Sequence, residues 1–275
     1  MAEGPGRPWR AVIHPHRAKK SLGQHFLVSE SVLSRVAALC REAAEGVEAI
    51  LEIGPGRGAL TRHLLDTGLP VRAVELDGCL ARELGGLFPG LEVAEGDGRA
   101  VRWPDLPGST GLSPWLLAGN LPYNAATEIL LNALAHPAEV KAAAVMVQRE
   151  VALKFTARPG GEGYGWMAAW TAAWWEGAVR LHVRPGSFSP PPRVQSSFLV
   201  LRRLRSPSLS PECAGTYRVF LEAAFRQPRR TLASNLARSL RSGGRPSPVR
   251  LSGIPPVLRA AQAAPEDLAR LFLGC

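Results

Sequence analysis

The chain of 275 residues has no apolar run long enough to cross a membrane. A membrane-spanning helix needs about 18 or more consecutive apolar residues, and no such stretch occurs. The N-terminal stretch MAEGPGRPWRAVIHPHRAKK contains basic residues but lacks an apolar core of the length found in secretory signals. We therefore expect a soluble, cytoplasmic protein that has no membrane partner.

Cysteine and histidine are scarce and scattered, which argues against metal sites and disulfides. The chain contains four cysteines and six histidines. No two cysteines have the spacing of a metal-ligand pair, no CxxC is present, and only His14 and His16 lie close together. We expect neither a structural zinc ion nor a disulfide, and no metal at the functional site.

Acidic residues are also few, with 23 against 33 lysines and arginines, which gives a net charge of +10. Only four of the 33 basic residues are lysines, a preference that GC-rich coding can produce. It does not account for the excess of positive charge. Because a basic surface displaces counterions from a phosphate backbone, nucleic acid is the leading class of partner.

Short apolar runs alternate with helix-like segments from residue 49 onward. This alternation is typical of βαβ units and predicts an α/β fold with a mostly parallel, doubly wound sheet. Two later runs, GAVRLHVRP and SSFLVLRRL, are separated only by a proline-rich turn, which is too short for a helical crossover. They should form an antiparallel hairpin, as in class I methyltransferases. The predicted parallel strands are 49–54, 71–76, 91–97, 115–120 and 142–148.

The composition divides the chain into three segments. Residues 1–18 are rich in proline, glycine and arginine and are expected to be a mobile arm. Residues 19–205 contain all the strand signals and should form the sheet domain. Residues 206–275 contain only helix-like segments with glycine and proline breaks, so we expect a small C-terminal helical domain.

A glycine-rich turn, ILEIGPGRGALT, follows the first predicted strand. Gly54, Gly56 and Gly58 permit a tight turn and the close approach of a ligand, although a purely structural turn can have the same composition. Glu75 ends the next strand and can accept both hydroxyls of a ribose. Asp97 follows the third strand, where it could accept an adenine amino group. Together these residues predict an adenosine pocket, although each acid alone could be a solvated strand end.

The fourth strand ends in the sequence Asn120, Leu121, Pro122 and Tyr123. The amine of adenine is a poor nucleophile, because its lone pair is delocalised into the ring. The Asn120 side-chain oxygen and the Leu121 carbonyl could accept its two hydrogens, and Pro122 would fix the backbone. Tyr123 offers a ring on which a flipped-out base could stack. The alternative is a structural turn with a core tyrosine.

These segments together resemble the KsgA/RsmA family of ribosomal RNA adenine N6,N6-dimethyltransferases. The similarity extends in family order over nearly the whole chain from residue 18 to residue 240. The segments that carry it are KKSLGQHFL (19–27), LEIGPGRGALT (51–61), VELD (74–77), GDGR (96–99), GNLPYNAAT (119–127), YGWMAAWTAAWW (164–175), FSPPPRVQSSFLVL (188–201) and FRQPRRTLASNL (225–236).

The resemblance implies roles for residues that spacing alone does not identify. In the family, the segment matching 24–27 closes over S-adenosylmethionine, so His25 and Leu27 become cofactor contacts along with Asn120. His25 stands where the family more often has asparagine. Phe188 matches a loop near the target base, although it could equally be a core residue. Arg229 and Arg230 match an arginine-rich, RNA-binding helix, within which Pro228 is awkward.

The function implied by the resemblance is methyl transfer from S-adenosylmethionine to N6 of two adjacent adenines in a 3′-end hairpin of 16S ribosomal RNA. The partner would be the small ribosomal subunit, and the protein would act as a monomer during ribosome biogenesis. Two alternatives stay open: an Erm-type methyltransferase of large-subunit RNA, and a non-catalytic assembly factor. A basic face should hold the RNA, formed by Arg17, Lys19, Lys20, Arg202, Arg203, Arg205, Arg226, Arg229 and Arg230.

Overall fold

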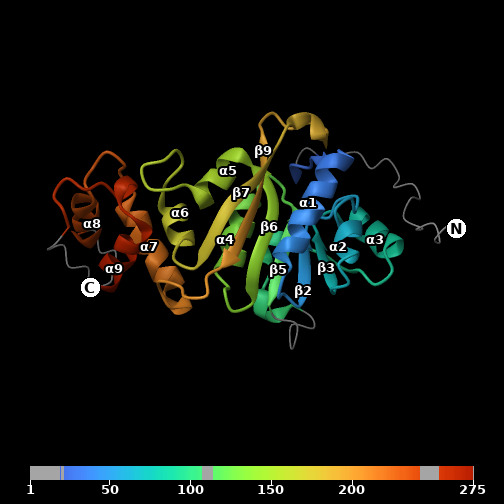
Figure 1. Ribbon diagram of the computed structural model, residues 1–275, viewed down its shortest axis with the longest axis horizontal. Coiled ribbons are helices and arrows are strands. Elements are labelled where there is room, and N and C mark those ends of the chain that lie inside the picture. Colours follow the sequence, from blue (N-terminus) through green and yellow to red (C-terminus); the bar gives the residue numbers. More distant parts are fainter. Residues whose placement is uncertain (1–18, 20–21, 107–113, 242–253, 275) are drawn as a thin grey trace.

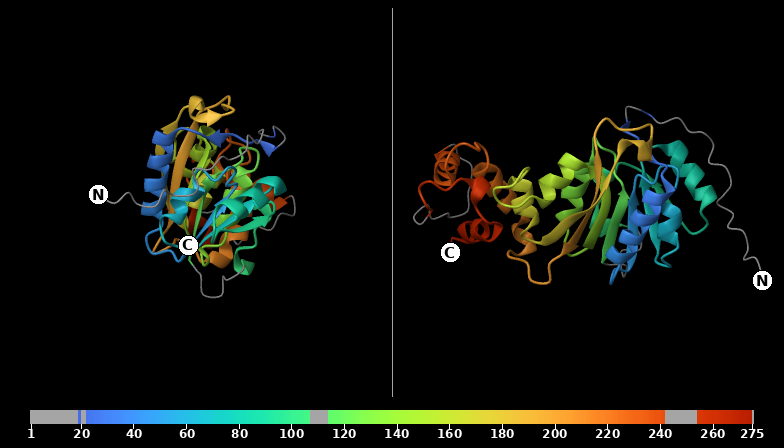
Figure 2. Two further views of the ribbon diagram at one scale, coloured as in Figure 1. Left: turned by 90° about the vertical axis from the view of Figure 1, so that its right-hand side faces the viewer. Right: turned by 45° about the horizontal axis from the view of Figure 1, so that its top comes forward.

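The computed structural model describes residues 19, 22–106, 114–241 and 254–274. The predicted arm, residues 1–18, lies outside this range. The described part of the chain forms an elongated molecule, with the sheet in the middle and the C-terminal helices at one end (Figures 1 and 2).

The predicted seven-stranded sheet is confirmed among the described residues, in the order β4-β3-β2-β5-β6-β9-β7. The direction in which successive strands are added reverses between β2 and β5, and open α/β sheets bind ligands at such a point. The strands are β2 (Ala49–Ile53), β3 (Val71–Glu75), β4 (Glu92–Glu95), β5 (Trp115–Asn120), β6 (Val140–Gln148), β7 (Trp175–Val183) and β9 (Ser196–Arg203).

The late antiparallel pairing is also confirmed. β9 is antiparallel to both β6 and β7, whereas β2 to β6 are mutually parallel where they pair. This follows from the short connection 184–195, which cannot contain the helix that a parallel crossover requires. Strand β9 therefore begins beside the carboxyl ends of the parallel strands.

Helices cover both faces because the inner strands are apolar on both sides. Side chains alternate along a strand, so Ile50 and Leu51 belong to opposite cores. The core of Ile50 includes residues from α1 (Glu30–Ala43), α2 (Thr61–Leu65) and α3 (Gly78–Leu87). The core of Leu51 includes residues from α4 (Ala126–Leu134) and α5 (Arg149–Thr156).

A second, two-stranded sheet pairs the N-terminal segment with the proline-rich turn. β1 (Phe26–Leu27) is antiparallel to β8 (Phe188–Ser189), with Leu27 in register with Phe188. The sequence did not predict this pairing, because each strand is only two residues long. It brings the segment before α1 next to the turn before β9.

The C-terminal helices pack on the sheet domain through a shared core. The C-terminal helices are α7 (Ala214–Ala224), α8 (Leu232–Arg241) and α9 (Pro265–Leu273), and α7 and α9 contact α6 (Trp166–Thr171) of the sheet domain. The Trp170 indole donates to the Ala214 carbonyl at 3.0 Å, and the Trp174 indole donates to the Leu209 carbonyl at 2.9 Å. The boundary near residue 205 stays a prediction, and removal of the helices would expose both tryptophans.

Candidate active site

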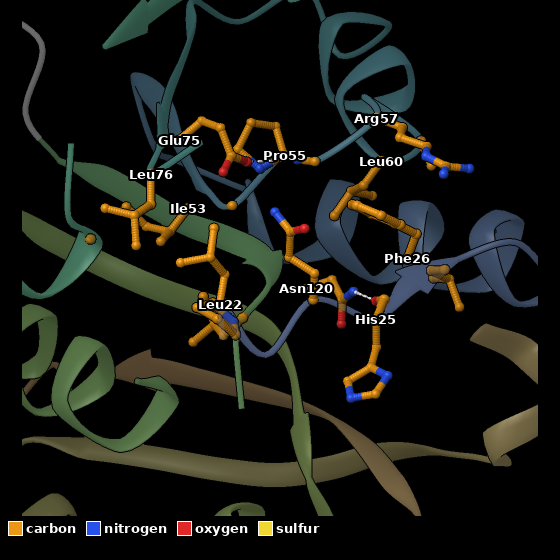
Figure 3. Close-up of a pocket in the computed structure, with 18 of the residues that line it drawn as sticks. Leu22, His25, Phe26, Ile53, Pro55, Arg57, Leu60, Glu75, Leu76 and Asn120 are labelled. Carbon is orange, nitrogen blue, oxygen red and sulfur yellow. Dashed lines mark hydrogen bonds between the residues drawn. The ribbon is translucent and has the colours of Figure 1, made fainter. Parts of the chain in front are cut away.

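A cavity of about 360 Å³ opens at the ends of β2, β3 and β5 (Figure 3). Its wall includes the glycine-rich turn, the ends of these parallel strands and the N-terminal segment from Leu22 to Val28. Eleven of the residues predicted from the sequence line it: His25, Leu27, Gly54, Gly56, Gly58, Glu75, Asp97, Asn120, Leu121, Pro122 and Tyr123.

The glycine turn requires glycine for conformation and for space. Gly54 and Gly56 have φ angles of +68° and +58°, in the left-handed region that L-residues rarely adopt. A Cβ atom on Gly56 would lie 2.9 Å from the Phe26 ring. The turn thus lets the backbone approach both the cavity and the N-terminal segment.

Glu75 is held rigidly at the edge of the cavity. Its two carboxylate oxygens accept hydrogen bonds from the Gly56 and Asp77 amides at 3.0 and 2.9 Å. Burial raises the pKa of Glu75, and these amides oppose that shift. Because each carboxylate oxygen can accept more than one hydrogen bond, capacity remains for the two hydroxyls of a ribose.

Asp97 lies at the cavity in an ion pair. Its carboxylate lies 2.6 Å from the Arg99 guanidinium and also accepts from the Arg99 amide. These bonds lower the pKa of Asp97 and keep it ionised. The predicted contact of Asp97 with an adenine amino group stays a prediction.

The side chain of Asn120 has a defined orientation. Its Nδ2 donates to the His25 carbonyl at 2.7 Å, as drawn in Figure 3. A carbonyl can only accept a hydrogen bond, so the amide atom that faces His25 must be the nitrogen Nδ2 and not the oxygen Oδ1. The opposite atom, Oδ1, is buried and has no partner within the described structure. An unpaired buried acceptor is costly unless a ligand supplies a donor.

The rings of Tyr123 and His25 pack against each other at the cavity wall. Their ring centroids are 5.2 Å apart, with an interplanar angle of 31°. The Tyr123 hydroxyl is hydrogen-bonded to the Ser196 hydroxyl, and His25 Nδ1 donates to the Pro190 carbonyl at 2.8 Å. The N-terminal segment, the turn after β5 and the turn before β9 are thereby joined.

The structure adds an anchor that sequence reasoning missed. The Lys19 ammonium lies 2.8 Å from the carboxylate of Asp77, whose side chain is only 1% exposed. The hydrogen bond to Asp77 raises the pKa of Lys19. Lys19 therefore ties the start of the N-terminal segment to the turn that follows Glu75.

Phe188, Arg229 and Arg230, which were predicted to bind RNA, do not line the cavity. Phe188 is 3% exposed and belongs to the core beneath β1, so its contact with a base stays a prediction. The placement of Arg229 and Arg230 on a helix is wrong: both lie in the exposed turn between α7 and α8. Pro228 cannot continue a helix, and α8 begins only at Leu232.

The described residues contain neither a metal-binding cluster nor a membrane-spanning helix. No cluster of three or more histidine, cysteine, aspartate or glutamate side chains within them could hold a metal ion. None of the helices in the same ranges is long and apolar enough to cross a bilayer.

A buried acid under the glycine turn predicts a pH-dependent stability. Glu52 is 1% exposed and accepts a hydrogen bond from Thr61 at 2.6 Å, and burial raises its pKa from about 4.5 to about 8. The folded state therefore favours the protonated acid. The free energy of unfolding should fall as pH rises between these two values, by up to a few kcal/mol.

Glu52→Gln keeps an acceptor for Thr61 but cannot ionise. Urea unfolding should give similar free energies for the variant and the native protein below about pH 4.5 and a more stable variant at about pH 9. A difference that stays constant over this range would contradict the assigned pKa.

The strand order, the glycine turn, the acid ending β3 and the polar sequence ending β5 together define a class I methyltransferase. Comparisons with known proteins refine this class. The sequence profile described as "Ribosomal RNA adenine dimethylase" matches residues 15–273. The chain belongs to the ribosomal RNA adenine dimethylase family, whose methyl donor is S-adenosylmethionine.

Individual relatives agree with this membership. A "Ribosomal RNA small subunit methyltransferase A" from Geobacter sulfurreducens is 38% identical, with 78% of this chain and 79% of that protein covered. The protein of the same name from Rubrobacter xylanophilus is 38% identical over 93% of this chain and 94% of its own length.

Solved structures agree as well. The 23S rRNA methyltransferase ErmE is 27% identical, with a TM-score of 0.66 over 90% of this chain and 98% of its own. A dimethyladenosine transferase from Plasmodium falciparum is 22% identical, with a TM-score of 0.70 over 90% of this chain and 96% of its own, and supports the fold.

Proposed function

We propose that this protein transfers methyl groups from S-adenosylmethionine to N6 of two adjacent adenines in a 3′-end hairpin of 16S ribosomal RNA. The products would be N6,N6-dimethyladenosines, formed during ribosome biogenesis. Family membership supports the chemistry, and the relatives named for the small subunit support the substrate. The observation that carries the proposal is the buried, unpaired Oδ1 of Asn120.

The residues around the cavity fit the proposed cofactor. Gly56 leaves room where a Cβ atom would clash with the Phe26 ring, and Glu75 presents a fixed carboxylate to ribose hydroxyls. Asp97 would accept from the adenine amine, with His25 and Leu27 closing the cavity from the N-terminal segment. When bound, S-adenosylmethionine supplies an electrophilic methyl group.

The protein's part in the reaction is to orient the target amine. Asn120 Oδ1 and the Leu121 carbonyl would accept the two N6 hydrogens, which favours the pyramidal nitrogen that attacks. Pro122 restricts the backbone at that carbonyl, and Tyr123 offers a stacking surface. This mechanism relies on positioning and needs no strong general base.

The Erm-type alternative differs only in its RNA substrate. Similarity to ErmE is real but lower than the 38% identity to the small-subunit relatives. Purified small and large ribosomal subunits lacking both modifications should be offered together with labelled S-adenosylmethionine. The label should enter the small-subunit RNA, whereas incorporation into the large subunit alone would establish the alternative. A non-catalytic assembly factor would label neither subunit.

Arg229 and Arg230 are proposed to hold RNA through phosphate contacts. Charge reversal of both should weaken small-subunit binding. In a plot of log binding constant against log salt concentration, the slope should become shallower by roughly 1.5, because each lost phosphate contact removes about 0.7–0.9. Cofactor affinity should not change. Arg270→Glu, an exposed arginine on α9, is the control. An unaltered salt slope in the double variant would show that these arginines are only a solvated surface.

Arg202 and Arg203, two arginines of the expected basic face, lie at the end of β9 away from the cavity, and their contact with RNA stays a prediction. β9 starts beside the cavity with Ser196 and runs to the opposite edge of the sheet, where Arg202 and Arg203 lie. The Arg202 guanidinium donates to the Glu42 carbonyl, and the Arg203 guanidinium donates to the Pro137 carbonyl. Each arginine therefore joins the end of β9 to another segment of the chain.

The remaining predictions concern assembly and place. We expect the protein to act as a monomer in the cytoplasm, with the small subunit as its partner and without a metal. The high positive charge of the chain is consistent with a ribosomal RNA substrate.

A further inference from the structure

The hydroxyl of Tyr123 is used inside the protein. Tyr123 lies in the turn after β5, and its hydroxyl is hydrogen-bonded to that of Ser196. Ser196 is the first residue of β9 and is fully buried, at 0% exposed. The two residues are 73 positions apart, so no local pattern in the sequence explains this bond.

Ser196 is held firmly at the end of the sheet where the parallel strands terminate. Strand β9 lies between β6 and β7, and Ser196 is in register with Gln148 on one side and with Val183 on the other. A residue paired on both sides has little freedom to move. Tyr123 has no strand neighbours, and the orientation of its ring depends on contacts made by its side chain.

A second contact restrains the same ring from the N-terminal segment. The His25 ring packs against Tyr123, and His25 Nδ1 is held by the Pro190 carbonyl. The His25 backbone carbonyl in turn fixes the Asn120 amide. The stacking ring and the amine-binding amide are thus held in one connected frame.

We propose that Ser196 is a positioning residue for the target adenine: its hydroxyl holds the Tyr123 ring in the orientation on which the flipped-out base stacks. This inference rests on the proposed function. Ser196 would not touch the base, because it is fully buried and does not line the cavity. Ser196 therefore acts on the reaction only through Tyr123, because its hydroxyl fixes the position of the Tyr123 phenol.

The adjacent residue provides a matched control. Ser197 is also 0% exposed on β9, but alternation along the strand points its side chain to the opposite face. There its hydroxyl is hydrogen-bonded to His182 Nδ1 at 3.1 Å. Ser197→Ala therefore removes a similar buried hydroxyl from the same strand without altering the site.

Single-turnover methylation of small ribosomal subunits should separate the two serines. Ser196→Ala should lower the maximal rate about tenfold, a loss typical of one hydrogen bond to a positioned group. The subunit concentration at half-maximal rate and the Kd for S-adenosylmethionine should stay within about twofold, because phosphate contacts dominate RNA affinity. Ser197→Ala should methylate at the native rate.

A double-mutant cycle tests whether Ser196 acts through Tyr123. Tyr123→Phe removes the same hydrogen bond and leaves the sheet untouched, so it should show the same loss as Ser196→Ala. The double variant should be no slower than either single variant. Tyr123→Phe also decides the question if Ser196→Ala fails to fold.

Equal rates for Ser196→Ala and Ser197→Ala would overturn the proposal, as would a native rate for Tyr123→Phe or additive losses in the double variant. These outcomes are distinct from failure of the proposed function. In that case the native protein itself would leave small subunits unmethylated.

Discussion

Asn120→Ala should lower the maximal rate of methyl transfer roughly a hundredfold or more, by analogy with removing a hydrogen-bonding group that stabilises a transition state. The lost Oδ1 is the buried acceptor that no group of the described protein satisfies. Its bond to the target amine would strengthen as the nitrogen pyramidalises, so the loss belongs to the chemical step. Rapid-quench measurements at saturating cofactor and subunit would give this rate directly.

Asn132→Ala is the control for this variant. The Asn132 side chain also donates to a backbone carbonyl, that of Val101 at 2.7 Å, but lies outside the cavity. It should retain the native rate. Small-subunit binding by Asn120→Ala should change little. If the Asn120 variant turns over at a near-native rate, the proposed amine contact is wrong.

Glu75→Ala should weaken binding of S-adenosylmethionine at least tenfold, measured by calorimetry. Hydrogen bonds to a charged group contribute about 1.5–3 kcal/mol each, and the carboxylate is placed to accept two from a ribose. The same variant also releases the Gly56 and Asp77 amides, which loosens the glycine turn. The fold should survive, because the surrounding sheet is paired on both sides of β3.

Glu95→Ala is a matched control for the cofactor prediction. Glu95 is in register with Glu75 on the neighbouring strand β4, but it is exposed and does not line the cavity. Its removal should leave cofactor affinity within about twofold, as for most exposed side chains. Equal affinities for the Glu75 variant and the native protein would refute the ribose contact.

Local patterns predicted the parts of this protein that depend on neighbours in the sequence. The parallel strands follow from apolar runs between helices, and the position of Glu75 follows from the strand that precedes it. Because parallel strands end at one edge of a sheet, Glu75 and Asn120 were expected to meet, and both line the cavity. The proline-rich turn predicted the antiparallel hairpin, because it is too short to contain a helical crossover.

Contacts between distant segments could not be predicted from such patterns. The pairs Lys19–Asp77 and Tyr123–Ser196 join residues whose separation matches no helical or strand period. Phe188 is another case, because an aromatic residue in a turn suits a core or a binding surface equally well. Arg202 is a further case, because its hydrogen bond to the Glu42 carbonyl joins β9 to α1 across 160 positions.

Mass spectrometry of small-subunit RNA, digested both to oligonucleotides and to nucleosides, gives the most direct test of the central claim. Subunits from cells that lack the modification would be incubated with the protein and S-adenosylmethionine carrying a labelled methyl group. The structure and the family predict two adjacent N6,N6-dimethyladenosines near the 3′ end, with both methyl groups labelled. Label on ribose or on another base, or no incorporation by the native protein, would contradict the assignment of the Asn120 site as an adenine N6 clamp.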